Sequence, residues 1–226
     1  SLIEMLLVIG LSLLVLLAAS EFYGISRSLF FKLKGAEEDS LAIQAALGKM
    51  RIDLLRAGFG LELPIRAGAA EGITAGGSLV ILSQEAKYNL ATACVAGEKR
   101  VTLEKTSGLS AGSRVCLADE EKAERHIIAS LEGSTIVLSD TLENSYAPAD
   151  SRLLLLEKVT YFLDARTNVL RRKVNASPAQ PLLDNAGLFE FVFLKEDNLV
   201  RVKLADKKNM ERAQGNKVLP QKHMRA

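Results

Sequence analysis

The chain has 226 residues, a formal net charge of +2 and 48% hydrophobic residues. This length accommodates one or two domains, and so small a net charge does not indicate a nucleic-acid-binding surface. An apolar run at the N-terminus raises the hydrophobic share, and the remainder has the composition of an ordinary soluble domain without tryptophan.

Residues 1–20 form one apolar run with a single charged side chain, Glu4. No charge follows from Met5 to Ala19, and the run is long enough to approach a bilayer-spanning helix. A carboxylate in such a segment is costly without a partner, so Glu4 is interpreted as a functional residue. A secretory signal would place basic residues before its apolar core, and the sequence has none there.

The order Ser1-Leu-Ile-Glu4 before an apolar helix resembles the start of a mature type IV pilin or pseudopilin. In that family a Gly cleavage site and an N-methylated aromatic residue precede the motif, so we expect prepilin peptidase processing and a chain that is numbered one residue late. The resemblance implies that Glu4 makes a subunit-assembly contact. It also implies a membrane or filament-core helix that includes Leu2, Ile3, Met5, Leu6, Leu7, Val8, Ile9, Leu11, Leu13 and Leu14.

After Ser20 an apolar stripe continues at steps of three and four, which is typical of one face of an α-helix. Its members are Phe22, Ile25, Leu29, Leu33, Ala36, Ile43, Leu47, Met50 and Leu54. No proline occurs before Pro64, and Gly58-Phe59-Gly60 supplies a stop signal. We therefore predict one helix of about 56 residues, roughly 84 Å long. Residues 1–20 are its transmembrane or filament-core part, and residues 21–58 are its amphipathic continuation.

The end of this predicted helix carries a second resemblance. Arg51-Ile-Asp-Leu-Leu-Arg-Ala-Gly-Phe-Gly60 is similar to the same region of PilW-like minor pilins. An amphipathic helix with an ordinary glycine cap explains the same residues, so both interpretations stay open here.

Residues 59–206 are predicted to form a β-rich head against which the stripe packs. Short β-prone runs at intervals of about 10 to 14 residues suggest a small all-β unit, inserted at 79–150. The runs are Leu79–Ser83, Arg100–Glu104, Arg114–Leu117, His126–Ser130 and Thr135–Ser139. In an exported head, Cys94 and Cys116 would form a disulfide, with two buried free thiols as the alternative.

A C-terminal sheet is predicted at 152–206, with strands at Leu153–Leu163 and Val169–Val174. Phe189, Phe191 and Phe193 alternate, as do Val200, Val202 and Leu204, which places each set on one face of a half-buried hairpin. We expect the aromatic face to pack against the helix stripe. The order Tyr161…Leu170-Arg-Arg172…Gln180-Pro-Leu-Leu-Asp184…Phe191…Val200-Arg-Val-Lys-Leu204 resembles the C-terminal sheet of PilW-like minor pilins and J-type pseudopilins.

The basic tail, residues 207–226, is expected to be a solvated segment, with a weak contact to an acidic partner or DNA as the alternative. No residue pattern predicts a catalytic centre or a cofactor. His126 and His223 lack metal-ligand partners at useful spacing. Asp119-Glu120-Glu121…Glu124 lacks the pattern of a Ca²⁺ loop, so a solvated charge run is the favoured interpretation.

The sequence thus predicts a non-enzymatic α+β protein with a pilin-like fold. The leading hypothesis is a minor pilin that helps to initiate a type IV pilus or lies near its tip. The alternatives are a J-type pseudopilin of a type II secretion system and a non-polymerising, single-pass anchored periplasmic binding protein. The expected partners are other pilin subunits, and the expected location is the inner membrane with a periplasmic head before assembly into a filament.

Overall fold

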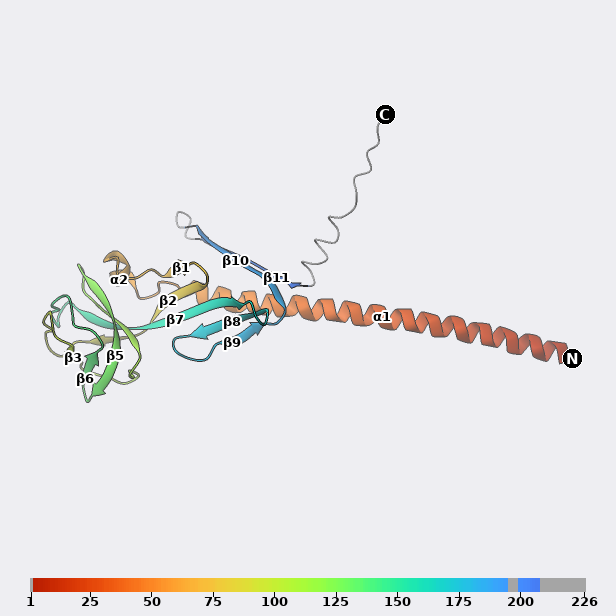
Figure 1. Cartoon of the computed structure of the whole chain (residues 1–226), viewed down its shortest axis with the longest axis horizontal. Helices are drawn as coiled ribbons and strands as arrows, with labels where there is room; N and C mark the ends of the chain where they lie inside the picture. The colour runs from red at the N-terminus through yellow and green to blue at the C-terminus, as the bar shows by residue number, and fades with distance from the viewer. Residues whose placement is uncertain (1, 195–198, 208–226) are drawn as a thin grey trace, which may run out of the picture. The chain divides into compact units, whose positions relative to one another are not determined.

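The computed structural model describes residues 2–194 and 199–207 and divides the chain into two units, Ser1–Ala45 and Ala46–Ala226. Helix α1 (Leu2–Leu55) is one unbroken helix (Figure 1). The predicted helix is therefore confirmed, and it ends three residues before the predicted bound. Everything that follows α1 in sequence belongs to the second unit, which is the β-rich head.

Glycines shape the chain immediately after α1. Gly58 and Gly60 have φ values of +72° and +71°, in the left-handed region where a side chain would be strained. The Gly58 N–H donates to the carbonyl of Leu82 at 2.8 Å, which joins the end of the helix to the sheet. A short helix, α2 (Glu62–Arg66), follows. The predicted glycine stop is thus confirmed.

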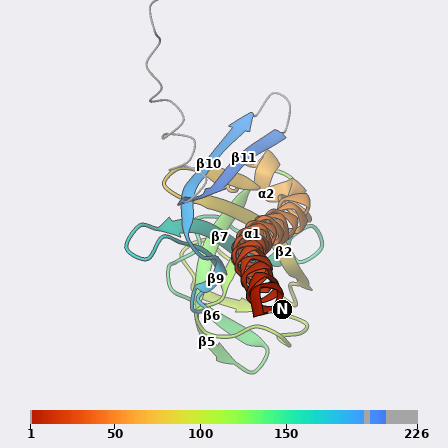
Figure 2. The ribbon, with the colours of Figure 1, turned by 90° about the vertical axis from the view of Figure 1, so that its right-hand side faces the viewer.

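The head contains a nine-stranded antiparallel sheet in the order β1-β2-β7-β4-β5-β6-β3, with β8 paired to β7 and β9 to β8 (Figures 1 and 2). The strands are β1 (Ile73–Ala75), β2 (Leu79–Asn89), β3 (Arg100–Thr102), β4 (Arg114–Ala118), β5 (Ala123–Glu132), β6 (Thr135–Leu138), β7 (Arg152–Asp164), β8 (Val169–Val174) and β9 (Gln180–Leu183). A separate hairpin is formed by β10 (Ala186–Leu194) and β11 (Leu199–Asp206).

Strand β7 is the centre of this arrangement. It pairs with β2 from Asn89↔Arg152 to Leu79↔Tyr161. On its other edge, β4 covers the beginning of β7 and β8 covers its end. The expected boundary near residue 150 therefore does not separate two sheets, because strands from 79–150 pair directly with β7.

The buried core lies on both faces of the sheet. Along β4, Val115 and Leu117 belong to one apolar cluster, whereas Cys116 and Ala118 belong to another. This is the period-two alternation of a strand that is covered on both sides. The first cluster contains residues of β2 to β7 and of the loops between them, and the second includes Leu61, which directly precedes α2.

The predicted disulfide is wrong, because both cysteines are free and buried. Cys94 packs in the same cluster as Val115 and Leu117, whereas Cys116 points to the opposite face of the sheet. The strand alternation therefore directs the two sulfur atoms into different cores. The alternative of two buried thiols is what the structure has.

Candidate functional site: the apolar helix and its attachment to the head

The first part of α1 exposes large apolar side chains on all sides. Leu2 is 80% exposed, and Leu7, Ile9, Leu11 and Leu13 are each more than half exposed. Glu4 lies in the first turn of the helix. The helix is long and apolar enough to cross a membrane, a property that a signal sequence can share. A single-pass anchor is thus consistent with α1.

The residues predicted for the filament-core helix all belong to this part of α1. Leu2, Ile3, Met5, Val8 and Leu14 are exposed like their neighbours, and Leu6 belongs to the same helix. Of the predicted stripe, Phe22, Ile25, Leu29 and Leu33 are also exposed. Apolar surface of this extent is typical of a segment that lipid or another protein covers.

The last turns of α1 belong to the head and bury one face. Ala46 and Met50 are each 1% exposed, and Asp53 is 4% exposed. Their spacing of four and three residues places them on one side of the helix. A buried carboxylate is rare in such a position and needs charged or hydrogen-bonding partners.

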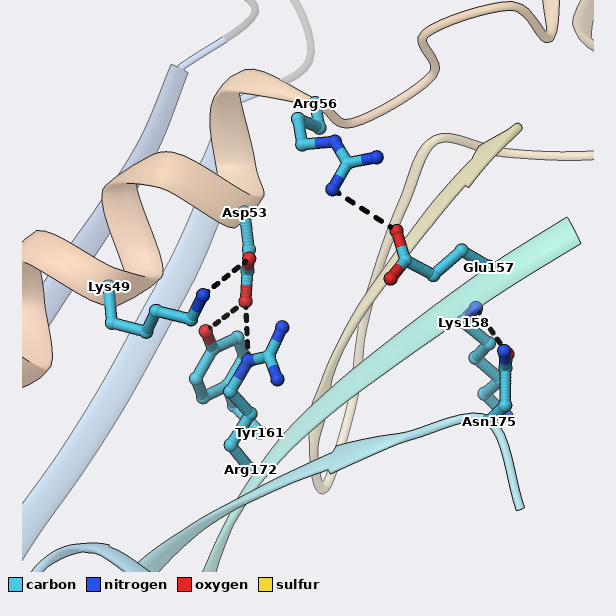
Figure 3. A network of polar contacts seen from close by, with 8 residues as sticks. All are labelled: Lys49, Asp53, Arg56, Glu157, Lys158, Tyr161, Arg172 and Asn175. Carbon is cyan, nitrogen blue, oxygen red and sulfur yellow. Dashed lines mark hydrogen bonds and ion pairs between the residues drawn. The ribbon is translucent and has the colours of Figure 1, made fainter. Parts of the chain in front are cut away.

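Asp53 finds those partners on strands β7 and β8, as Figure 3 shows. Its Oδ2 atom accepts a hydrogen bond from the Tyr161 hydroxyl at 2.5 Å and another from Arg172 Nε at 2.7 Å. Lys49, one turn earlier in α1, places its Nζ atom 3.9 Å from Oδ1. The carboxylate is thus compensated by an internal cation, a phenol and a half-exposed lysine.

The pKa values of this network follow from its surroundings. Burial alone would raise the pKa of Asp53, but hydrogen bonds from Arg172 and Tyr161 and the nearby positive charges lower it below its ordinary value. Burial, together with the adjacent carboxylate, raises the pKa of Tyr161. The hydrogen bond to Asp53 raises the pKa of Arg172. At neutral pH the network therefore consists of a carboxylate, a guanidinium and an uncharged phenol.

A second contact flanks the network on its solvent side. Arg56 Nη1 lies 3.4 Å from Glu157 Oε2, across the gap from the end of α1 to β7 (Figure 3). The Arg56 side chain is 54% exposed, so water screens this ion pair. Asp53 is the stronger attachment of the helix to the sheet.

A groove of about 1140 Å³ lies between the last turns of α1 and the hairpin β10–β11. Met50 and Leu54 line one side, and Phe193, Val200 and Val202 line the other. The alternating faces predicted for the hairpin are confirmed by its register, in which Phe191 pairs with Val202 and Phe193 with Val200. The aromatic face is half-buried, and Phe189 packs on Phe191 with ring centroids 5.1 Å apart.

The histidine contacts Glu124, the last member of the acidic run. His126 is buried in β5, with Nε2 3.1 Å from Glu124 Oε2. Glu124 also accepts hydrogen bonds from the N–H groups of Glu143 and Asn144 at 2.7 and 3.2 Å. It therefore anchors the connection between β6 and β7. No metal-ligating group of three side chains occurs within residues 2–194 and 199–207.

Sequence reasoning missed the Asp53 network. Asp53 falls three residues after Met50, on the buried side of the helix, but it is not part of the predicted apolar stripe. Its partners stand 108 and 119 positions later in the chain. A carboxylate in phase with buried apolar residues was the available signal.

No family model matches the sequence, and no curated protein matches it. Three solved structures of phage tailspikes have low structural similarity to this chain. The Gp54 tailspike of Acinetobacter baumannii bacteriophage AP22, in complex with capsular saccharide, has a TM-score of 0.31 and 15% identity over 34% of this chain. The tailspike gp49 of Pseudomonas phage LKA1 has a TM-score of 0.30 and 17% identity over 33% of this chain. The tailspike gp61 of Pseudomonas phage phi297 has a TM-score of 0.28 and 19% identity over 32% of this chain. The match spans 15%, 14% and 14% of those chains, and similarity at this level carries no argument about function.

Proposed function

We propose that the chain is a minor pilin, a structural subunit that helps to initiate a type IV pilus or lies near its tip. The observation that supports this most is the exposed apolar first part of α1, with Glu4 in its first turn, in a chain that continues into a β-rich head. Before assembly, the apolar residues hold the subunit in the inner membrane and the head lies in the periplasm. During assembly, the same residues pack against the helices of other subunits.

In this proposal, Glu4 fixes the axial position of the subunit in the filament. Its carboxylate pairs with the N-terminal amine of an adjacent subunit, so that a charge inside an apolar bundle is compensated. A subunit displaced along the axis would lose this pair, and the loss of one partner of a buried ion pair costs about 3–5 kcal/mol. The pairing therefore selects one axial position among many that bury similar apolar area.

The Asp53 network provides the mechanical link in this proposal. Force applied to an assembled helix reaches the head through the peptide chain and through the contacts of the last turns. Asp53, Tyr161 and Arg172 tie those turns to the two strands β7 and β8. Charge-assisted hydrogen bonds of this kind are about twice as strong as neutral ones.

The test is to replace Glu4 by Gln and by Ala and to measure the amount of subunit in sheared filaments. We expect incorporation to fall by more than about tenfold, because a loss of only 1.4 kcal/mol already changes an equilibrium tenfold. Membrane insertion should stay unchanged, since both replacements keep the segment apolar enough to span. Glu21→Gln, at the end of the apolar run, is the matched control and should be incorporated normally.

Normal incorporation of both Glu4 variants would contradict the proposal. Deletion of the gene separates two filament types: loss of a surface pilus supports a minor pilin, and loss of protein secretion supports the J-type pseudopilin. An anchored protein that never polymerises would be absent from preparations of either filament.

A further inference from the structure

A second exposed surface lies on α1 directly after the apolar run that ends at Ser20. This aromatic–basic face consists of Tyr23, Arg27, Phe30, Phe31 and Lys34. Because each residue turns an α-helix by about 100°, these side chains fall within about 100° of its circumference. Ile25 and Leu29 of the apolar stripe lie on the opposite side of the helix. The two surfaces can therefore meet different partners.

The aromatic side chains of this face are exposed and lie where a membrane-spanning α1 would leave the hydrocarbon. Tyr23 is 67% exposed, Phe30 62% and Phe31 56%. If Leu2 lies at one boundary, a hydrocarbon core of about 30 Å ends about 20 residues later, beside Tyr23. Tyrosine is enriched at such a boundary, because its ring is apolar and its hydroxyl is polar. The face is thus placed at the level of the lipid headgroups.

The order of charges along α1 suits a negative surface beside the apolar run. Residues 22–36 contain no acid and three basic side chains, those of Arg27, Lys32 and Lys34. Three acids follow at 37–39, farther from the run. Glu21 lies beside the run, but about 120° around the helix from Arg27. An anionic membrane surface would therefore attract the nearer, basic group more strongly than it repels the distant acids.

Arg27 has the geometry of a phosphate-binding side chain. Its guanidinium carbon lies 5.7 Å from the centroid of the Phe31 ring, one turn later on the same face. This cation–π contact restrains the side chain but uses none of the five N–H donors of the guanidinium. Arg27 forms no ion pair within residues 2–194 and 199–207. Its donors can therefore bind two phosphate oxygens at once, as planar guanidinium groups do.

We propose that the aromatic–basic face binds the headgroups of anionic phospholipids while the chain is anchored in a membrane. Its positive charge and its direct continuity with the apolar run select this ligand. Arg27 binds phosphate, and the aromatic rings lie among the headgroups. Lys34 lies about 17 Å beyond Tyr23 along the axis, and the headgroup layer is about 5–8 Å thick. The long Lys34 side chain therefore brings its charge to within about one Debye length, 8–10 Å, of the surface. The inference rests on the membrane-anchored stage of the proposed function and not on the filament.

The chain contains no tryptophan, so Tyr23→Trp introduces a single fluorescent reporter on the face. The full-length variant is reconstituted in vesicles of equal parts phosphatidylcholine and phosphatidylglycerol, with bromine on the acyl chains of one lipid or of the other. Bromine quenches the tryptophan only at contact, so the ratio of the two quenching efficiencies measures the preference for the anionic headgroup. We expect phosphatidylglycerol to be preferred about fivefold or more, since each lysine or arginine near an anionic surface contributes about that factor.

Matched variants separate this face from the overall charge of the protein. Arg27→Gln/Lys34→Gln should bring the preference close to one, and raising NaCl from about 0.05 M to about 0.5 M should weaken it several-fold. Lys87→Gln/Lys105→Gln removes the same charge from two exposed positions of the head and should leave the preference unchanged. Ile25→Trp places the reporter on the opposite side of the helix and should show a smaller preference. All of these variants keep the apolar run, so they should insert equally.

The two proposals fail in different ways. Equal quenching of Tyr23→Trp by the two lipids, or an equal preference at Ile25→Trp, would overturn this inference. The proposed function would then stand, because its own test is the incorporation of Glu4 variants into filaments. Protection from both lipids that grows with the protein-to-lipid ratio would show that protein covers the face instead. Quenching by neither lipid at any ratio would reject the membrane anchor, and with it both proposals.

Discussion

The buried Asp53 carboxylate is the counter-charge of Arg172, so its removal should change the stability of the fold. Asp53→Asn keeps the size of the side chain but leaves the half-buried Arg172 guanidinium without its counter-charge. We expect the free energy of unfolding to fall by about 3 kcal/mol, the typical loss when one partner of a buried ion pair is removed. Chemical denaturation followed by the near-ultraviolet circular dichroism of tyrosine measures this change, because Tyr161 belongs to the network. Asp164→Asn, whose partner Arg171 is more exposed, is the control and should cost less than about 1 kcal/mol.

The lowered pKa of Asp53 predicts that the stability of the fold depends on pH. The pKa of Asp53 is lower in the folded chain than its ordinary value of 3.8, so its ionisation stabilises the fold above that value. This contribution is lost as the pH falls through the lowered pKa. The difference in stability between the wild type and Asp53→Asn should therefore be constant near neutral pH and shrink below about pH 4. A difference that does not change with acidification would contradict the assignment of charge.

The two cysteines make a prediction that separates free thiols from a disulfide. Burial raises the pKa of Cys94 to about 11 and that of Cys116 to about 12, so neither is a thiolate at pH 8. Alkylation of the native, unreduced protein should add no mass. After unfolding without reductant, both cysteines should be alkylated. A disulfide would leave the unfolded and unreduced protein unmodified.

At the scale of elements, the junction of α1 with the sheet depends on a close approach of two glycines. A Cβ atom at Gly72 would lie 2.8 Å from the backbone nitrogen of Gly58. Gly72→Ala should therefore force the two segments apart and destabilise the head by about 1–3 kcal/mol, as overpacking usually does. Gly76→Ala, with open space around it, should change stability by less than about 0.5 kcal/mol. Thermal denaturation of both variants beside the wild type provides the comparison.

Some elements could be predicted from local sequence, and others could not. The stripe from Phe22 to Leu54 predicted α1 because helical periodicity is a local property, and alternation did the same for β10 and β11. The short strands β1 and β9 were missed, because β1 is followed directly by Gly76-Gly77 and Pro181 interrupts β9. The pairing of β7 with three strands was also missed, because register between distant segments depends on burial of the whole sheet rather than on any one strand.

The candidate site divides in the same way. The apolar run and Glu4 were recognisable because an acid among leucines is visible in the sequence itself. Asp53 was overlooked because its meaning depends on Tyr161 and Arg172, which belong to other elements. The disulfide prediction was wrong for a related reason. The spacing of two cysteines along a chain does not reveal on which face of the sheet each sulfur atom lies. Sequence is informative about local chemistry and weak about long-range partners.

For the whole molecule, the position of β7 governs when the head can fold. Strands β2 and β4 both pair with β7. The ribosome synthesises β7 dozens of residues after β2, so β2 must wait for its partner. Loop-closure entropy opposes such distant pairing, and folding that relies on it is slow. During synthesis, the first half of the head therefore emerges with unpaired strand edges that invite aggregation. A chain anchored by its N-terminus would meet this interval at the membrane surface, where a chaperone able to cover bare strands would raise the yield of folded subunit.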